Sequence, residues 1–292
     1  MTFNDDANIE GGRVSKRGRN AAIAGGGGGL VVVALVIVSQ LTGFDLTGLA
    51  PLLGGGSGTE TSTDQSGDLD QCKTGAQANN NIDCRMKAAA TSLDAYWLTQ
   101  VDGYTQPQLV IYDGQTDTGC GTASNAVGPF YCPPDQKVYI DTSFYNELQT
   151  QFGASGGPLA QLYVVAHEWG HHIQNITGQM NNLNLQDTGA TSDSVRLELQ
   201  ADCYAGAWVD GVSSTPDANG VPFLKKPTDA EIADALNAAA AVGDDHIQET
   251  LGSGSVNPET WTHGSSEERQ RWFQTGYTKG VASCDTFSAA TL

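Results

Sequence analysis

The sequence predicts an α+β fold, mainly helical with a small sheet, preceded by one transmembrane helix. Three observations support this prediction: two short strand-like runs early in the folded part, several helix-like stretches after them, and an uncharged apolar run near the N-terminus. Strands and helices that follow one another in separate blocks are typical of α+β domains. The 292 residues are enough for one or two domains with a hydrophobic core.

The N-terminal part divides into three predicted segments. Residues 21–44 carry no charge and are long enough to cross about 30 Å of hydrocarbon as a helix. The four basic residues before them predict a cytoplasmic basic tail over residues 1–20 and an extracytoplasmic domain after the span. Residues 45–70 are rich in Gly, Ser and Thr, which predicts a linker. A cleaved signal peptide is the alternative, because a basic start and an apolar run also fit one.

The charge of the chain excludes one class of partner. The formal net charge is −19, and after residue 44 there remain 10 basic and 30 acidic residues. Binding to nucleic acid needs clustered Lys and Arg, so we expect no nucleic-acid partner. The excess acid is interpreted as a solvated surface. The sequence specifies no oligomeric state.

The six cysteines predict three disulfides and an oxidising compartment, because none of them has C-x-x-C spacing. Six cysteines allow 15 pairings, and only the two pairs separated by 12 residues have a spacing that favours one. Six reduced thiols in a cytosolic protein are the alternative. The pairing that we expect is Cys72–Cys84, Cys120–Cys132 and Cys203–Cys284.

The predicted elements all lie in the domain over residues 71–292. A helix is expected at 84–99, and strands rich in β-branched and aromatic residues are expected at 109–113 and 137–141. Each of four later helices stops at a glycine, and two of them begin at capping residues. These helices are expected at about 158–177, 192–210, 228–242 and 265–279.

The first of these four helices carries His167-Glu168-Trp169-Gly170-His171. Residues i and i+4 share a helical face, so His167 and His171 can reach one zinc ion. Glu168 is rotated by about 100° from His167, where it can take a proton from a metal-bound water without binding the metal. This H-E-x-x-H pattern is typical of metallopeptidases, although it also occurs by chance on ordinary helices.

The next helix offers a third ligand. Glu198 and Asp202 are again i and i+4, so Glu198 can complete a His₂Glu site while Asp202 accepts the second ring N–H of a zinc-binding histidine. Two solvated carboxylates without a role are the alternative. Cys203 lies about 140° around the helix from Glu198, so we assign it to a disulfide and not to the metal.

Longer motifs lie between residues 72 and 287: CGTASNAVGPFYCPPDQKVYID, VVAHEWGHHIQ, LELQADCYAGAW, GDDHIQ and HGSSEERQRWFQTGY. In these motifs the chain resembles the bacterial "putative neutral zinc metallopeptidase" family, zincin-type proteins related in motif to the thermolysin-like gluzincins. The resemblance implies a zincin-like domain that binds Zn²⁺ through His167, His171 and Glu198, with Glu168 as general base.

Peptide hydrolysis also needs a donor for the oxyanion. His263 is the first candidate, because it follows Glu198 by 65 residues, a spacing similar to the thermolysin-like arrangement. His246 and Tyr204 are weaker candidates, and Asp244 or Asp245 can hold such a histidine.

The sequence therefore predicts a membrane-anchored zinc peptidase of the cell membrane. Its substrate would be a peptide or protein that adds to an exposed edge strand at 137–141. A non-catalytic, metal-stabilised extracellular binding module is the alternative, but such a module needs no general base. An adhesin or scaffold would not need the metal at all.

Overall fold

The computed structural model describes residues 2–17, 69–124, 127–250, 252 and 254–292. Two turns of 3₁₀ helix, Pro258–Thr260 and Val281–Ser283, flank the last long helix. The strands are β1 (Val14–Lys16), β2 (Gln108–Tyr112), β3 (Gln115–Thr118), β4 (Gly121–Ser124), β5 (Phe130–Cys132) and β6 (Lys137–Asp141). The helices are α3 (Gly75–Asn80), α4 (Ile82–Gln100), α5 (Phe144–Thr150), α6 (Pro158–Ile176), α7 (Asp193–Gly211), α8 (Asp229–Ala241), α9 (Asp244–Thr250) and α10 (Ser266–Lys279).

The predicted α+β fold is confirmed, and the long helices lie within two residues of their predicted bounds. The starts differ because the sequence marks the capping residue and not the first helical one. Ser192 accepts the backbone N–H of Val195 just before α7. Thr228 and Ser265 form capping boxes with Glu231 and Glu268 before α8 and α10. Local side-chain caps thus fix where these helices begin.

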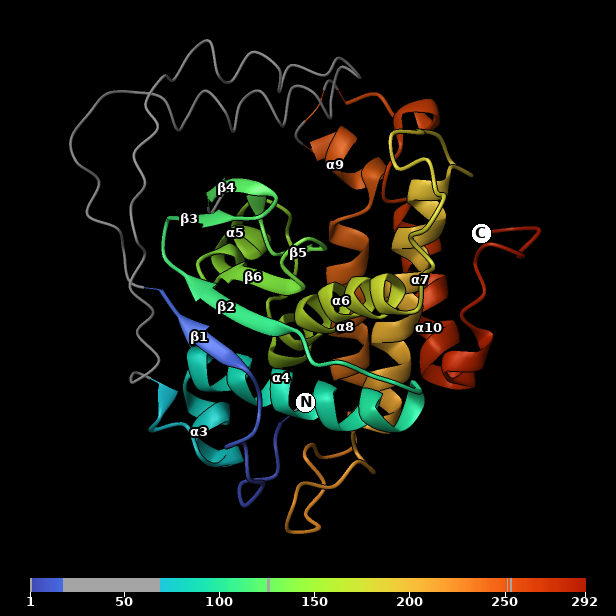
Figure 1. Ribbon diagram of the computed structural model, residues 1–292. Coiled ribbons are helices and arrows are strands. Elements are labelled where there is room, and N and C mark those ends of the chain that lie inside the picture. Colours follow the sequence, from blue (N-terminus) through green and yellow to red (C-terminus); the bar gives the residue numbers. More distant parts are fainter. Residues whose placement is uncertain (1, 18–68, 125–126, 251, 253) are drawn as a thin grey trace, which may run out of the picture.

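The main sheet has four strands in the order β1-β2-β6-β5, and β3 and β4 form a separate two-stranded sheet. β1 and β6 both pair with β2 in parallel, while β5 pairs with β6 antiparallel. The prediction that 137–141 is an exposed edge is therefore wrong. That strand is β6, and its two sides are occupied by β2 and β5, so the edge strand beside the helices is β5. Figure 1 shows the sheet beside the group formed by α6, α7, α8 and α10.

Residues 2–17 belong to the folded domain, which corrects two predictions. The predicted separate tail over residues 1–20 and the predicted domain boundary at residue 71 are both inconsistent with the contacts that residues 2–17 make. β1 pairs with β2 through the register Val14↔Leu109, and Phe3 and Ile9 are buried in the same hydrophobic core as α6 and α7. Apolar burial and ladder hydrogen bonds thus fix this segment, although its composition is polar.

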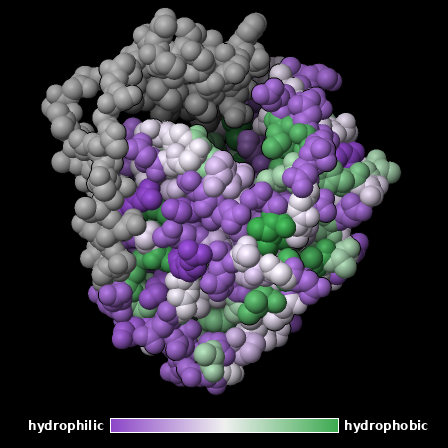
Figure 2. Space-filling view, viewed as in Figure 1, coloured by the Kyte–Doolittle hydropathy of each residue, from purple (hydrophilic) through white to green (hydrophobic). Residues whose placement is uncertain are grey.

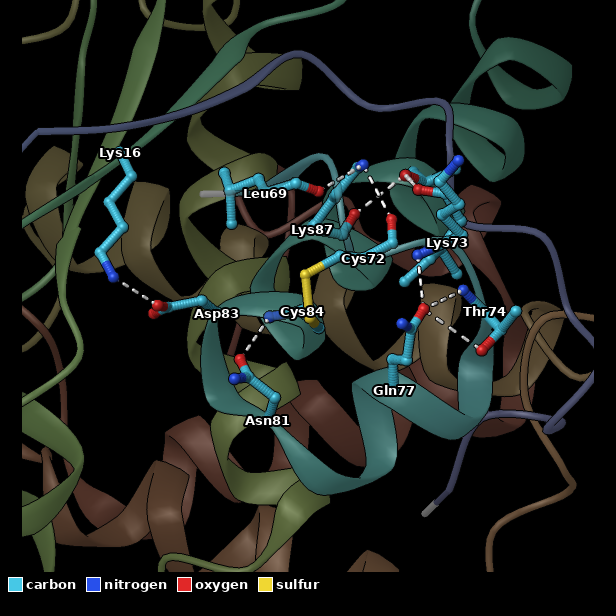
Figure 3. Close-up of a disulfide and its surroundings, with 12 residues drawn as sticks. Lys16, Leu69, Cys72, Lys73, Thr74, Gln77, Asn81, Asp83, Cys84 and Lys87 are labelled. Atoms are coloured by element: carbon cyan, nitrogen blue, oxygen red, sulfur yellow. Dashed lines mark hydrogen bonds and ion pairs between the residues drawn. A yellow bond between two sulfur atoms is a disulfide. The ribbon is translucent and has the colours of Figure 1, made fainter. Parts of the chain in front are cut away.

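Lys16 of β1 forms a 2.7 Å ion pair with Asp83 of α4, next to the disulfide between Cys72 and Cys84 (Figure 3). Beside the same disulfide, the Lys87 amine donates hydrogen bonds to the carbonyl oxygens of Leu69 and Cys72. The chain therefore re-enters the domain at residue 69 close to the point where the N-terminal segment is held.

The predicted membrane span over residues 21–44 and most of the linker over 45–70 lie outside the described residues. Within the described part of the chain, we find no helix that is both long and apolar enough to span a bilayer. The face of the described residues seen in Figure 2 is mostly hydrophilic with scattered hydrophobic residues.

All three expected disulfides are present, and no cysteine is free. The Cys203–Cys284 bond ties α7 to the C-terminal segment across 81 residues. The Cys120–Cys132 bond joins the loop after β3 to the edge strand β5.

Candidate metal centre

α6 presents one face to the core and another to the candidate metal site. Leu162, Val165 and Trp169 are fully buried among apolar side chains, as their helical spacing predicts. His167 and His171 lie on a different face, with their rings edge to face at a centroid distance of 4.8 Å. The apolar face therefore fixes α6 in the core and leaves the histidines for the site.

A close approach of α7 brings the third group to this face. A Cβ atom at Gly170 would lie 3.0 Å from the Cα of Ala201, so the glycine in the motif lets the two helices touch. As a result, Glu198 Oε2 lies 3.0 Å from His167 Nε2, and Glu198 Oε1 lies 3.3 Å from His171 Nε2. Burial alone would raise the pKa of Glu198, but the two histidines hold it well below its ordinary value.

The three residues fit a zinc ion. One ligand atom from each of His167, His171 and Glu198 lies within 4.8 Å of the others. Ligands of a tetrahedral zinc with bonds of about 2.0–2.1 Å stand about 3.3 Å apart, which is close to the 3.0 and 3.3 Å between Glu198 and the two histidines. Two imidazoles and one carboxylate are a donor set that zinc prefers, and three ligands leave a position open for chemistry.

Both histidine rings are held by their other nitrogen. His167 Nδ1 lies 2.8 Å from Asp202 Oδ1, and His171 Nδ1 lies 2.8 Å from Gln174 Oε1. Because the carboxylate and the amide oxygen accept, each Nδ1 donates a proton, and each Nε2 is left to bind a metal once its own proton, now shared with Glu198, is released. Gln174 is fully buried and donates to the carbonyl oxygen of Leu197 on α7. The rings are therefore oriented for a metal before one binds.

Asp202 is the centre of a buried polar network. Its side chain is inaccessible to solvent and accepts hydrogen bonds from Tyr163 Oη at 2.5 Å and from both Nε and Nη2 of Arg269, at 2.8 and 3.0 Å. Burial would raise the pKa of Asp202, but Arg269 and His167 lower it to about 2. Arg269 is only 3% exposed, so its buried guanidinium depends on this carboxylate as its counter-charge.

Glu168 lies on the wall of a cleft of about 420 Å³ that also contains His167, His171, Glu198 and His263. The Glu168 side chain is buried, and burial raises its pKa against the opposing effects of the two histidines. The backbone of Tyr131, in the edge strand β5, also hydrogen-bonds Glu168. The remaining wall is mainly apolar and includes Phe130, Phe144, Val164, Val242 and Ile247.

His263 lies in the loop before α10 and lines the same cleft. Its backbone N–H donates to Asp244 Oδ2 at 2.6 Å, and its Nδ1 lies 3.3 Å from Asp244 Oδ1. Burial would lower the pKa of His263, but Asp244 and Glu198 raise it. The two weaker candidates do not line this cleft: His246 faces the carbonyl oxygen of Phe152, and Tyr204 packs on Trp97.

Three residues of the site, namely Tyr163, Gln174 and Arg269, were not predicted from the sequence. Tyr163 precedes His167 by four residues, so its place on the same face was readable from the helix period. Gln174 follows His171 by three residues, which gave the same signal. Arg269 carried no such signal, because a charged residue in the first turns of a polar helix is ordinarily solvated.

Comparison with known proteins bears on this geometry. A family model described as "Putative neutral zinc metallopeptidase" matches residues 2–287.

The chain belongs to this family.

The family assignment implies Zn²⁺, and the His167–His171–Glu198 group is the described cluster able to hold it. The uncharacterized protein Rv2575 of Mycobacterium tuberculosis (strain ATCC 25618 / H37Rv) is 53% identical over 227 residues, which are 77% of each chain. The uncharacterized protein YpfJ of Escherichia coli (strain K12) is 44% identical over 195 residues, which are 63% of this chain and 62% of that protein. No solved structure matches. The family match starts at residue 2, so it includes the N-terminal segment that packs against the domain.

Proposed function

We propose that this zinc metallopeptidase family member hydrolyses peptide bonds with Glu168 as general base and His167, His171 and Glu198 as the zinc ligands. One observation carries the proposal. The three ligand groups converge on one point, and the buried carboxyl group of Glu168 lies beside them on the wall of the same cleft. A purely structural zinc site is closed by four protein ligands and needs no general base.

The chain's own groups would share the reaction as follows. Zinc, when bound by these residues, supplies a Lewis acid and brings the pKa of a water toward 7. Glu168 accepts a proton from the attacking water and delivers it to the leaving amine. His263, whose Nδ1 lies 3.3 Å from Asp244 Oδ1, lines the cleft and would donate a hydrogen bond from Nε2 to the substrate carbonyl oxygen as charge develops there.

A peptidase family implies a peptide or protein substrate. β5 is the sheet edge next to Glu168, so we infer that an extended peptide adds to this strand. The apolar wall formed by Phe130, Phe144, Val164, Val242 and Ile247 favours apolar substrate side chains.

We also propose that the enzyme works in an oxidising, extracytoplasmic compartment, which three disulfides favour. Membrane attachment through residues 21–44 stays a prediction.

The deciding experiment compares wild type with Glu168→Gln in the full chain, since residues 2–17 belong to the fold. We expect about one zinc per chain in both proteins, but hydrolysis of a denatured protein substrate by wild type alone. Glu267→Gln is the matched control, because its side chain is 84% exposed on α10. Equal activity of wild type and Glu168→Gln would show that Glu168 is not the general base. Zinc binding without hydrolysis in any protein would favour a metal-stabilised binding module.

A further inference from the structure

A buried carboxyl group lies behind the metal centre and has no part in the proposed reaction. Asp94 of α4 is 4% exposed, and its Oδ1 accepts a hydrogen bond from the Tyr104 hydroxyl at 2.6 Å. Its other oxygen, Oδ2, is buried without a hydrogen-bond partner among the described residues. A buried carboxyl oxygen without a partner is costly, so its presence in a folded protein requires an explanation.

Asp94 is connected to the metal-binding helix through one side chain. The Tyr104 hydroxyl that donates to Asp94 also accepts the indole N–H of Trp169 at 2.9 Å. Trp169 is fully buried and stands between His167 and His171 in the motif, rotated by about 200° from each of them. Asp94, Tyr104 and Trp169 therefore form one hydrogen-bonded line that ends on the back of the helical turn carrying the two histidines.

Asp94 also borders a cavity of about 210 Å³ between α4 and the N-terminal segment. Among the described residues, the charge of Arg13 in the N-terminal segment acts on Asp94, and Asp217 of the loop after α7 lines the same cavity with its carboxylate occupied by backbone N–H groups. Burial raises the pKa of Asp94 to about 7, against the opposing effects of the Tyr104 hydrogen bond and the Arg13 charge. Asp94 thus changes its charge near neutral pH.

We propose that Asp94 is a positioning residue of the metal centre: it fixes the Trp169 indole through Tyr104, and does so most firmly when its carboxyl is ionised. An ionised carboxylate is the stronger acceptor for the Tyr104 hydroxyl. A hydroxyl polarised in this way is in turn the stronger acceptor for the indole N–H. The inference rests on the proposed function, because it concerns the geometry of the same centre.

The first test observes Trp169 directly in the zinc-loaded full chain. The protein is labelled with ¹⁵N at the tryptophan indoles, and the Trp169 signal is assigned by its loss in Trp169→Phe. Between pH 5.5 and 8.5 we expect the indole proton of wild type to shift downfield in a single titration. The signal should stay constant in Asp94→Asn and in Tyr104→Phe if the protein still folds. A constant wild-type signal, or an unchanged titration in Asp94→Asn, overturns the proposal.

The second test separates positioning from a purely structural role. The ratio of kcat/KM between wild type and Asp94→Asn is measured at pH 5.5 and 8.5. We expect a ratio near 1 at pH 5.5 and about 3- to 10-fold at pH 8.5, which is the worth of one hydrogen bond. A ratio that is equal at the two pH values would indicate packing alone and contradict the proposal. If no protein hydrolyses peptides, the proposed function fails, while the indole titration still decides this inference.

Discussion

Asp202 allows the sharpest test of how the metal centre is held together. Asp202→Asn keeps the shape of the side chain but removes its charge and turns one acceptor oxygen into an NH₂ group. In either orientation the NH₂ group faces a donor: Arg269 Nε at the Oδ2 position, or Tyr163, His167 and Arg269 Nη2 at the Oδ1 position. The buried Arg269 then lacks a counter-charge.

The contacts of Asp202 set the loss of stability that we expect for Asp202→Asn. Removing one partner of a buried ion pair costs about 3–5 kcal/mol in the free energy of unfolding. Proton linkage gives an independent lower figure. The pKa of Asp202 is about 2 in the folded protein and 3.8 ordinarily, and this difference is worth about 2.4 kcal/mol at neutral pH. Loss of the carboxylate beside a zinc-binding histidine should also weaken zinc binding by about 10- to 100-fold.

The sign of the pH dependence follows from the lowered pKa. The stability that Asp202 contributes is fully present above its ordinary pKa near 3.8 and is lost as the pH falls toward 2. The stability gap between wild type and Asp202→Asn should therefore be constant from about pH 5 to neutrality and narrow under acid conditions.

Urea unfolding of the zinc-free proteins measures the stability gap, and competition with a chelator of known affinity measures zinc binding. Asp210→Asn is the matched control, because Asp210 is exposed on the same helix. The prediction fails if the free energy of unfolding of Asp202→Asn lies within about 1 kcal/mol of the wild-type value and its zinc affinity within about twofold. That result would show that the Asp202 network does not hold the metal centre together.

Four further results are expected. His263→Ala should lower kcat by about 100- to 1000-fold with a smaller effect on KM, and Asp244→Asn should lower it less; steady-state kinetics would reveal an unaffected kcat if His263 has another role. Chelation should abolish hydrolysis and lower the unfolding midpoint, and added zinc should restore both; activity that survives complete zinc removal would argue against the centre. Replacing Cys203 and Cys284 by alanine should cost about 4 kcal/mol in urea unfolding, and a loss below about 1 kcal/mol would contradict this. Because the pKa of Asp94 is raised to about 7, its ionisation lowers the stability of the folded protein as the pH rises from about 4 to 7. Asp94→Asn should therefore gain stability relative to wild type over that range. Thermal unfolding that shows no such gain would contradict a raised pKa of Asp94.

Local periodicity predicted the part of the site that two helices contribute. The i, i+4 spacing of His167 and His171, and of Glu198 and Asp202, fixes which side chains share a face, so these pairs are readable from the sequence. The contact between Glu198 and the histidines could only be assumed, because periodicity within one helix does not say how two helices pack. The small residues Gly170 and Ala201, which allow that packing, are visible in the sequence only as tolerated positions in a helix.

The unpredicted parts depend on contacts between distant residues. Arg269 meets Asp202 across 67 residues, and the pattern of α10 gives no reason for a buried guanidinium. β1 has only three residues, and its parallel pairing with β2 carries no local signal. The order of strands in the sheet, which makes β5 the edge, is likewise a non-local property.

The pairing of β1 with β2 limits how this protein can relate to a lipid bilayer. The N-terminal segment and the chain from Leu69 onward belong to one globule, because β1 pairs with β2 and Lys87 holds the carbonyl oxygen of Leu69. The N-terminal strand and the cleft with the candidate metal site therefore share one compartment for as long as this fold persists.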